Sequence, residues 1–286
     1  MAPEQQPSEA DERARLGESD EPVEDKLVEE FQNTVAEGAN KLNRTWRAQI
    51  ITGLFGGIDV GLGLMAMLAV LEATDSKLLG GLAFGIGLFA CRLAHSELFT
   101  EDFLLPINAV MARRGTWWQL VRLWVVTLAM NLIGGWLFMW FVVAAFPRFE
   151  SVLTETATGY MEKGLTSETV SLALLAGFTI TLITRMNQGS SEGMVTLANS
   201  LIAGFLVVGL GMLHGALNAV VIFGAMHAGA AISYVDWLIW FAWVVPLNVL
   251  GGLLMLAFPR LIRTWELVQK ERAAEDSGSS QTSVVS

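Results

Sequence analysis

The chain has 286 residues, of which 53% are hydrophobic and only 16% are charged, and it contains ten tryptophans. A soluble domain rarely needs so much apolar surface, so this composition excludes an ordinary soluble fold and indicates a membrane protein. The formal net charge of −10 arises almost entirely at the N-terminus, because residues 1–40 hold twelve Asp and Glu against three Lys and Arg. The single cysteine excludes an intramolecular disulfide.

Three regions follow from this distribution of charge and apolar residues. Residues 1–40 form an acidic tail, rich in Pro, Gln and Ser, which we expect to be cytoplasmic and largely disordered. Near its end, from about Asp25, helical spacing of apolar residues predicts a helix that runs along the membrane surface. Residues 41–265 form the predicted transmembrane domain, and residues 266–286 a second polar cytoplasmic tail.

Six apolar segments predict six spans, so the expected fold is an all-α membrane protein. In chain order the spans are Ile50–Leu71, Leu78–Met111, Trp117–Phe146, Thr169–Met186, Thr196–Ala228 and Trp237–Phe258. As unbroken helices, spans 2 and 5 would each be roughly 50 Å long, against a hydrocarbon core of about 30 Å. We therefore expect both to be broken, span 2 at ELFTED (Glu97–Asp102) and span 5 at Gly215 within HGALN. Such breaks persist at membrane depth only where the loose backbone is buried or lines a cavity.

The positions of Lys and Arg set the expected orientation. Eleven of these residues flank span ends that would be cytoplasmic, and three flank the opposite ends. This asymmetry predicts that both termini are cytoplasmic, and we expect the membrane to be a bacterial inner membrane.

The two halves of the transmembrane domain resemble each other. The sequence NLIGGWLF at Asn131–Phe138 is echoed 117 residues later by NVLGGLLM at Asn248–Met255, and the same offset carries Glu97 onto His214. Each half holds three spans, an odd number, so the second half must insert upside down relative to the first. Two inverted three-helix repeats with paired broken helices predict a solute site near the midplane, between the halves.

Ionisable residues interrupt span 2, and at membrane depth such residues usually mark a site because they are costly there. The polar cluster comprises Arg92, Glu97, Glu101 and Asp102, with Asp59 of span 1 as a further candidate. Arg92 is close enough in sequence to neutralise one carboxylate, and Asp59 could pair with Arg92 instead. A buried cluster would hold the break in place, whereas carboxylates exposed to a pore would repel anions. The sequence leaves both interpretations open, and we expect His95 to have a structural role.

At these residues the sequence resembles the formate/nitrite transporter family, as a divergent member. The resemblance covers residues 40–265 and rests on ELFTED with its Leu-Phe-Thr core, on LHGALNAV, and on the Asn-x-x-Gly-Gly pattern of span 6. It implies a homopentamer of aquaporin-like protomers, each with its own pore lined by the broken spans 2 and 5. Small monovalent anions such as formate or nitrite would pass through that pore.

The resemblance also assigns roles along the solute path. Leu98 and Phe99 would form a constriction on the cytoplasmic side, and Phe84 and Leu88 the opposite constriction. Thr100 would stand on the loop that reaches the central histidine. That histidine would be His214, with Asn218 one helical turn further on; Val207 occupies the position, seven residues earlier, at which the family has an aromatic residue.

Two stretches depart from the family pattern. Glu101 and Asp102 follow the Leu-Phe-Thr core, where small or amide residues are usual. Span 4 reads GFTITLITR, in place of the common Asn-containing apolar pattern. The fold therefore transfers more directly than the substrate does.

The expected chemistry follows from the dry part of such a pore. A bare carboxylate or nitrite cannot cross two apolar rings without a large desolvation cost. Helix N-termini would favour the anion locally. A central imidazole, with a reference pKa of about 6.5, could supply a proton and make the weak acid neutral. Transport is then either channel-like or proton-coupled.

Two alternatives stay open: a channel for a neutral or weakly basic small solute, suggested by Glu101 and Asp102, and a membrane protein without transport activity. No nucleotide-binding loop, Cys/His metal spacing or nucleophile motif points to an enzyme. We therefore expect no cofactor, metal or nucleic-acid partner. The expected partners are the small anion, the lipid bilayer and further copies of the chain.

Overall fold

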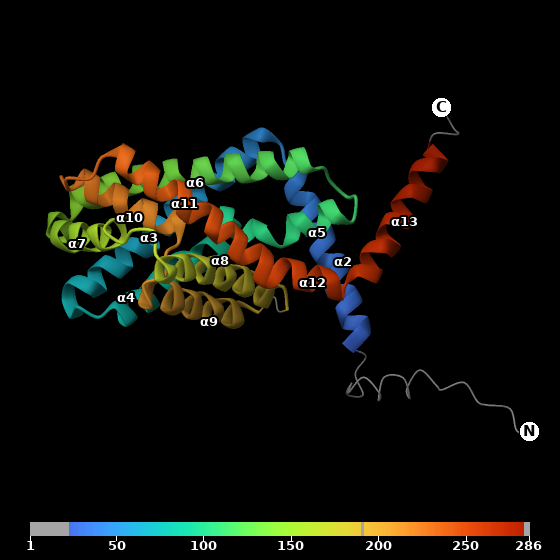
Figure 1. Ribbon diagram of the computed structural model, residues 1–286, viewed down its shortest axis with the longest axis horizontal. Helices are drawn as coiled ribbons and strands as arrows, with labels where there is room; N and C mark the ends of the chain where they lie inside the picture. Colours follow the sequence, from blue (N-terminus) through green and yellow to red (C-terminus); the bar gives the residue numbers. More distant parts are fainter. Residues whose placement is uncertain (1–22, 190–191, 283–286) are drawn as a thin grey trace, which may run out of the picture.

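The computed structural model describes residues 23–189 and 192–282, and every regular element in this part of the chain is helical. Long helices run side by side, with α7 at one end of the bundle and α2, α12 and α13 at the other (Figure 1). The elements are α2 (Val23–Leu42), α3 (Trp46–Thr74), α4 (Lys77–Leu93), η1 (Phe99–Phe103), α5 (Leu105–Met111), α6 (Trp117–Ala145), η2 (Pro147–Phe149), α7 (Glu150–Met161), α8 (Ser167–Gln188), α9 (Gly193–Gly204), η3 (Phe205–Gly209), α10 (Gly215–His227), α11 (Tyr234–Gly252), η4 (Leu253–Ala257), α12 (Phe258–Arg263) and α13 (Trp265–Thr282).

Four helical segments of the described residues are long and apolar enough to cross a membrane. They are α3, α6, α8 and the continuous run Tyr234–Arg263, which joins α11, η4 and α12. They coincide with predicted spans 1, 3, 4 and 6. The predicted spans 2 and 5 consist instead of shorter helices, so both predicted interruptions are present.

The two breaks differ in detail. The first lies between Leu93, where α4 ends, and Leu105, where α5 begins, and it contains the 3-10 turn η1. The second lies between Gly209, the end of the π-helical turn η3, and Gly215, the start of α10. We name these segments the first break and the second break.

Glycines allow the long helices to approach one another at matching places in the two halves. A Cβ atom at Gly57 of α3 would overlap the carbonyl of Asn131 in α6. A Cβ atom at Gly177 of α8 would likewise overlap the carbonyl of Asn248 in α11. Both helix pairs therefore pack backbone against backbone, beside the two asparagines that the sequence repeat singled out.

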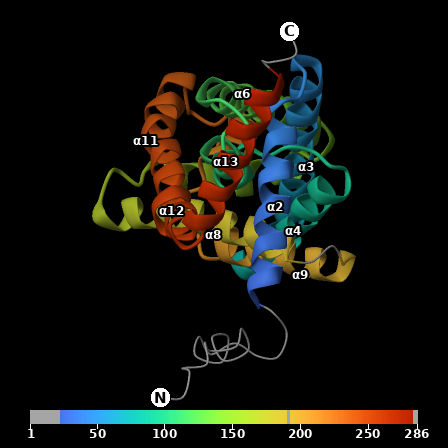
Figure 2. The same cartoon turned by 90° about the vertical axis from the view of Figure 1, so that its right-hand side faces the viewer.

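Helix α2 lies across one end of the bundle (Figure 2). The sequence predicts a helix here, along the membrane surface. In the structure α2 packs on α5 and buries Phe31, Val35 and Leu42 in a cluster that also contains Val268 of α13. An ion pair between Glu30 of α2 and Arg260 of α12, at 3.1 Å, adds to this contact.

Two helices were not predicted. Helix α7 is short and mixes polar with apolar residues, so its sequence lacks the long apolar run that identified the spans. Helix α13 lies in the predicted C-terminal tail and continues to Thr282.

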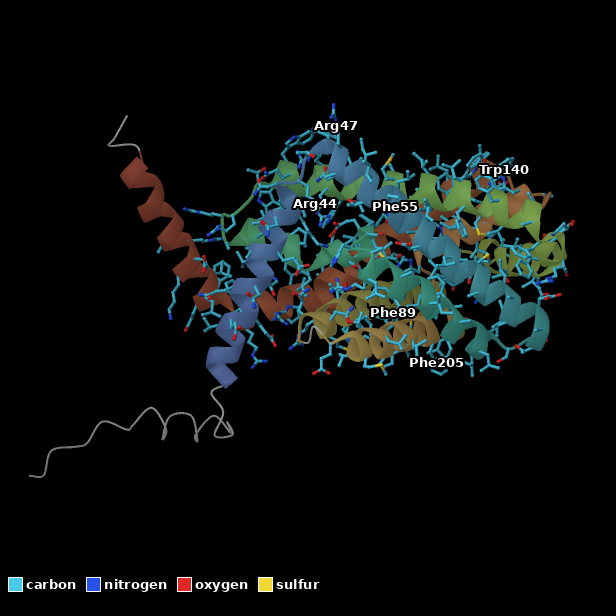
Figure 3. The ribbon with its side chains drawn as sticks, turned by 180° about the vertical axis from the view of Figure 1, so that it is seen from behind. Arg44, Arg47, Phe55, Phe89, Trp140 and Phe205 are labelled. Carbon is cyan, nitrogen blue, oxygen red and sulfur yellow. The ribbon has the colours of Figure 1, made fainter. Side chains whose placement is uncertain are left out.

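The outward faces of the long helices expose large apolar side chains. Phe55 of α3 is 52% exposed and Trp140 of α6 is 51% exposed, and both lie on the outside of the bundle (Figure 3). Such a surface needs cover from lipid or from another copy of the chain.

Candidate functional site

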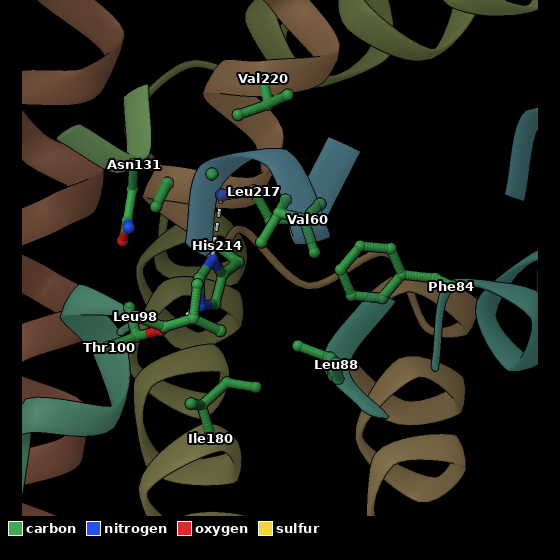
Figure 4. A pocket seen from close by; sticks show the side chains of 12 residues that line it. Val60, Phe84, Leu88, Leu98, Thr100, Asn131, Ile180, His214, Leu217 and Val220 are labelled. Carbon is green, nitrogen blue, oxygen red and sulfur yellow. Dashed lines mark hydrogen bonds between the residues drawn. The ribbon is translucent and has the colours of Figure 1, made fainter. Parts of the chain in front are cut away.

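A small cavity lies between the two breaks, near the middle of the bundle. We name it the central cavity; its volume is about 20 Å³, so it admits only a very small solute. Figure 4 shows its walls, which are apolar apart from His214, Thr100 and Asn131. Its lining comprises Gly57, Val60, Phe84, Leu88, Leu98, Thr100, Asn131, Ile180, His214, Ala216, Leu217 and Val220.

His214 and Thr100 join the two breaks across this cavity. His214 is the N-cap residue of α10 in the second break, and Thr100 lies in η1 of the first break. The Nε2 atom of His214 lies 3.2 Å from Oγ1 of Thr100, and both residues are buried. The contact predicted from the family resemblance is therefore present in the structure.

The hydrogen bonds of the His214 ring define its tautomer. Its Nδ1 atom accepts the backbone N–H of Leu217 at 3.2 Å, as the cap of α10 (Figure 4). In a neutral imidazole the hydrogen must then lie on Nε2, which donates to Thr100. Adding a second proton to the ring would break the cap, and the positive end of the helix dipole also disfavours a cation there. The geometry therefore favours neutral His214 with its Nε2–H at the cavity.

The N-terminus of α10 also faces the central cavity, because Ala216 and Leu217 line it. This end of a helix carries partial positive charge, which favours a negatively charged solute. The cavity thus combines apolar walls with two positive features, a helix end and an imidazole N–H.

One asparagine holds the backbone of each break. Asn131 of α6 accepts the N–H of Phe99 at 3.0 Å and donates to the carbonyls of Glu97 at 2.8 Å and Gly53 at 2.7 Å. These bonds satisfy backbone groups that a broken helix leaves without partners.

Asn248 of α11 makes the equivalent hydrogen bonds at the second break. It accepts the N–H of Gly215 at 2.7 Å and donates to the carbonyls of Leu213 and Ala173, each at 2.8 Å. Sequence comparison of the halves had identified both asparagines as a repeated pattern, but without a role for either.

Two larger cavities lie on either side of the central one. The α2-side cavity has a volume of about 560 Å³ and contains Lys41 and Arg92 in its lining. The α7-side cavity has a volume of about 480 Å³ and contains Lys77 and Lys163. Helix α4 lines all three, with Lys77 in the α7-side cavity, Phe84 and Leu88 in the central cavity, and Arg92 in the α2-side cavity. The three cavities are therefore stacked along α4.

The carboxylates of the first break are paired with cations from the N-terminal side of the chain. The Lys41 ammonium, at the end of α2, contacts Glu97 and lies 2.9 Å from Asp102. Arg44 also pairs with Glu97, and its side chain turns toward the bundle in Figure 3. Glu97 is 2% exposed and Asp102 is fully buried, so the two carboxylates are largely removed from water, whereas the Arg44 side chain is 30% exposed.

This pairing answers the question that the sequence left open. Arg92 approaches Glu101 at 4.0 Å, whereas Glu97 and Asp102 belong to Lys41. Among the ion pairs of the described residues, none joins Asp59 to Arg92. Glu97 and Asp102 therefore hold the break in place. Glu97 and Glu101 both line the α2-side cavity, but the Glu101 side chain is the more exposed, at 12% against 3%.

Three other expected path residues lie beside the central cavity rather than in its lining. The ring of Phe99 packs edge-on against Phe103 at 5.0 Å and against Trp124 at 6.3 Å. Val207 and Asn218 are buried, at 1% exposure each. This placement gives Phe99 a packing role in η1, although the sequence predicted that it forms a constriction with Leu98.

His95, for which the sequence predicts a structural role, lies just after the end of α4. It is exposed, lies in the left-handed region with φ of 54°, and ends α4 by donating its N–H to the carbonyl of Arg92 at 3.3 Å. It lines the α2-side cavity and not the central one.

Several contributors were missed by the sequence. Lys41 and Arg44 had been counted only as topology signals, and the unusual acids at 101–102 were the one hint that nearby cations are needed. Val60, Ile180, Leu217 and Val220 line the central cavity, but an apolar residue on an apolar helix carries no signal of that kind.

Comparison with known proteins agrees with this architecture. The family model described as "Formate/nitrite transporter" matches residues 28–262. The formate channel BtFdhC of Bacillus thuringiensis is 30% identical over 103 residues, which are 34% of this chain and 40% of that protein. The formate channel FocA of Escherichia coli K12 is 38% identical over 64 residues, 22% of each chain. The matched stretches therefore span less than half the length of these relatives.

Two solved structures share the fold. A chain described as "FNT family ion channel" superposes with a TM-score of 0.74 at 18% identity, over 82% of this chain and 99% of that one. A chain described as "Pentameric formate channel with formate bound" gives a TM-score of 0.63, also at 18% identity, over 77% and 97%. Because the family model covers most of the sequence, the chain belongs to the formate/nitrite transporter family.

Proposed function

We propose that this protein is a membrane channel or transporter for small monovalent anions of weak acids, with formate as the first solute to test. The observation that carries the proposal is the central cavity, where the N-terminus of α10 and the Nε2–H of His214 meet between apolar walls. The formate-channel relatives support the choice of solute. The stacking of three cavities along α4 supports a path through the protomer.

The test is solute flux into liposomes that contain the purified protein. We expect formate uptake well above that of empty liposomes, and little uptake of glycerol. Preferred uptake of glycerol would favour the alternative, a channel for neutral solutes. Absence of flux for formate, nitrite, acetate and glycerol would favour a membrane protein without transport activity.

Proton coupling through His214 is the finer form of the proposal. The neutral imidazole would take up a proton from water when the anion lies beside the ring, and it would then give a proton to that anion and return to the neutral form. The negative charge of the anion would compensate for the cap to Leu217 that the imidazolium loses. Replacement of His214 by Asn keeps a capping side chain and removes titration near neutral pH. Formate uptake by this variant should lose its dependence on pH between about 5 and 7.5. An unchanged pH profile would remove His214 as proton donor.

The assembled form that we propose is a homopentamer of six-span protomers with two inverted repeats. The equivalent hydrogen bonds of Asn131 and Asn248 support the repeat. The pentameric formate channel of similar fold supports the assembly. Native mass spectrometry from a mild detergent should give five copies, and a stable monomer or dimer in several detergents would count against the assembly.

We further propose a bacterial inner-membrane location with both termini cytoplasmic. In a background with Cys91 replaced by Ser, single cysteines at Ser76, Thr158 and Ser233 should react with an impermeant thiol reagent added to intact cells. A cysteine at the exposed Asn43 should be protected. The reverse labelling pattern would invert the topology.

A further inference from the structure

The wall between the central cavity and the α2-side cavity has two unlike halves. On one half, α4 and the first break present Leu88 and Leu98 to the central cavity and Cys91 to the α2-side cavity. Leu88 therefore lies on the same wall as Leu98, whereas the resemblance implied that it forms the opposite constriction. On the other half, α8 carries Ile180 in the central cavity and Asn187, two turns later, in the α2-side cavity. Those two residues are about 10 Å apart along the helix axis. The side chains of α8 between Ile180 and Asn187 are those that a solute would meet when it passes from one cavity to the other.

Thr184 lies between them, one turn after Ile180 and three residues before Asn187, so it belongs to the same face of α8, beside Ile183. Its side chain is buried, at 3% exposure. Its Oγ1 atom donates to the carbonyl of Ile180 at 3.0 Å. The hydroxyl hydrogen is thus committed to the helix backbone, and the oxygen keeps a free lone pair.

The neighbouring helix α9 repeats this arrangement. Thr196 lines the α2-side cavity, and Ser200 follows one turn further along α9. Ser200 is 2% exposed, and its Oγ atom donates to the carbonyl of Thr196 at 2.8 Å. An amide pair, Asn199 Nδ2 to Asn187 Oδ1 at 2.8 Å, ties α9 to α8 at this level.

We propose that Thr184 and Ser200 form an acceptor strip between the central cavity and the α2-side cavity, and that this strip selects the protonated form of a small weak acid. An oxygen that can only accept stabilises a solute that brings its own donor, such as the O–H of an undissociated carboxylic acid. It gives no such compensation to a bare carboxylate, which would lose its hydration against Leu88 and Leu98. The strip gives a role to Thr184, one of three threonines in GFTITLITR, the segment that departs from the family pattern. The inference rests on the proposed function, because it requires a weak acid as the solute.

The experiment compares formate flux into liposomes for the wild type and three variants. Thr184→Val keeps the shape of the side chain and removes the acceptor, whereas Thr184→Ser keeps the hydroxyl. Thr181→Val is the matched control: Thr181 is equally buried on α8 and donates to the carbonyl of Gly177 at 2.8 Å, but it faces Gly252 of α11. Loss of one net hydrogen bond at the barrier predicts a flux about five- to tenfold lower for Thr184→Val. Thr184→Ser and Thr181→Val should keep most of the wild-type flux.

Thermal unfolding in detergent checks that each variant is folded, and Ser200→Ala, on the other helix, provides an independent arm with the same expected direction. Equal flux for Thr184→Val and Thr181→Val would overturn the acceptor strip. So would an equal loss in Thr184→Val and Thr184→Ser, because that result would trace the loss to packing. Absence of formate flux in the wild type itself would overturn the proposed function, which is a different result from any difference among the variants.

Discussion

The first and second breaks are both held by the side chain of an asparagine, but the other contacts that hold them differ. In both, an asparagine accepts one backbone N–H from the residues past the break and donates to two carbonyls, Asn131 in the first and Asn248 in the second. The first break is also held by buried charge, through Lys41 and Asp102. The second break is capped by its own residue, His214. Non-helical backbone at membrane depth is therefore held by a distant residue, Lys41, in the first break and by a residue of the break itself, His214, in the second.

The difference matters because the two breaks touch. Thr100 of the first break lies 3.2 Å from His214 of the second. A shift of the first break therefore reaches the imidazole directly. The asparagine and the cap that hold the second break, Asn248 and His214, both belong to its own half. The position of Thr100 is set in part by the end of α2, which belongs to the N-terminal segment of the chain.

The largest expected effect comes from removing Lys41, the anchor of the first break, which pairs with Asp102 and Glu97. Lys41→Met leaves the buried carboxylate of Asp102 without its cation and leaves Glu97 with Arg44 alone. Breaking a buried pair in this way costs about 3–5 kcal/mol. Thermal unfolding in detergent should show a large loss of stability. Lys77→Met, at an exposed lysine of α4, is the control and should change little.

A second substitution tests whether charge is the cause. Adding Asp102→Asn to Lys41→Met removes the stranded carboxylate and should recover part of the lost stability. A double variant as unstable as Lys41→Met would assign the loss to packing of the lysine stem, and the comparison of the two breaks would lose its electrostatic basis.

The next largest loss of stability is expected from replacing the asparagine that holds each break. Asn248→Leu and Asn131→Leu each leave one backbone N–H and one carbonyl at a break without the asparagine as partner, at about 1–3 kcal/mol for each buried group. We expect both variants to lose stability by similar amounts, since the two asparagines make equivalent bonds. Asn43→Leu, at an exposed asparagine, is the control. A large loss for one variant and none for the other would mean that the two breaks are not built alike.

These contacts also mark how far the sequence reaches. Span length predicted that spans 2 and 5 are broken, because helices of that length do not fit a bilayer. The interruptions ELFTED and HGALN gave the positions of the breaks. The resemblance brought Leu98, Thr100 and His214 to the central cavity. The orientation of the Phe99 ring could not be predicted from the sequence, since it depends on contacts with Phe103 and Trp124.

The pairing of Lys41 with Asp102 could not be predicted from the sequence for a different reason. Its partner Asp102 is 61 residues away, and no periodic pattern links an N-terminal helix to a turn at membrane depth. Buried acids in a membrane protein imply a cation somewhere near them, and only the fold says which one. Arg92, the nearest in sequence, pairs with the less buried Glu101 instead.

A smaller effect separates the cap from the transport role of His214. His214→Ala removes the acceptor for the N–H of Leu217, and loss of an N-cap costs about 1 kcal/mol. His214→Asn should keep most of that stability, because Asn is a good N-cap residue. Unfolding temperatures of the two variants measure the difference. Equal stability would show that the second break does not depend on its local cap.

The smallest expected effect on stability lies at Glu101, the most exposed of the three carboxylates of the first break. Glu101 lines the α2-side cavity, and its pair with Arg92 is long, at 4.0 Å, with the Arg92 side chain 28% exposed. Pairs of this kind contribute about 0–1 kcal/mol, so Glu101→Gln should leave the unfolding temperature almost unchanged. Removing a negative charge next to the passage should instead raise formate flux in liposomes, and the gain should shrink as salt screens the field. Asp102→Asn, which alters a fully buried carboxylate held by Lys41, should change stability more than Glu101→Gln does and give no salt-dependent gain in flux. If Glu101→Gln destabilised the protein as strongly as Asp102→Asn, both acids would belong to the anchor, and the first break would present no charge to the solute.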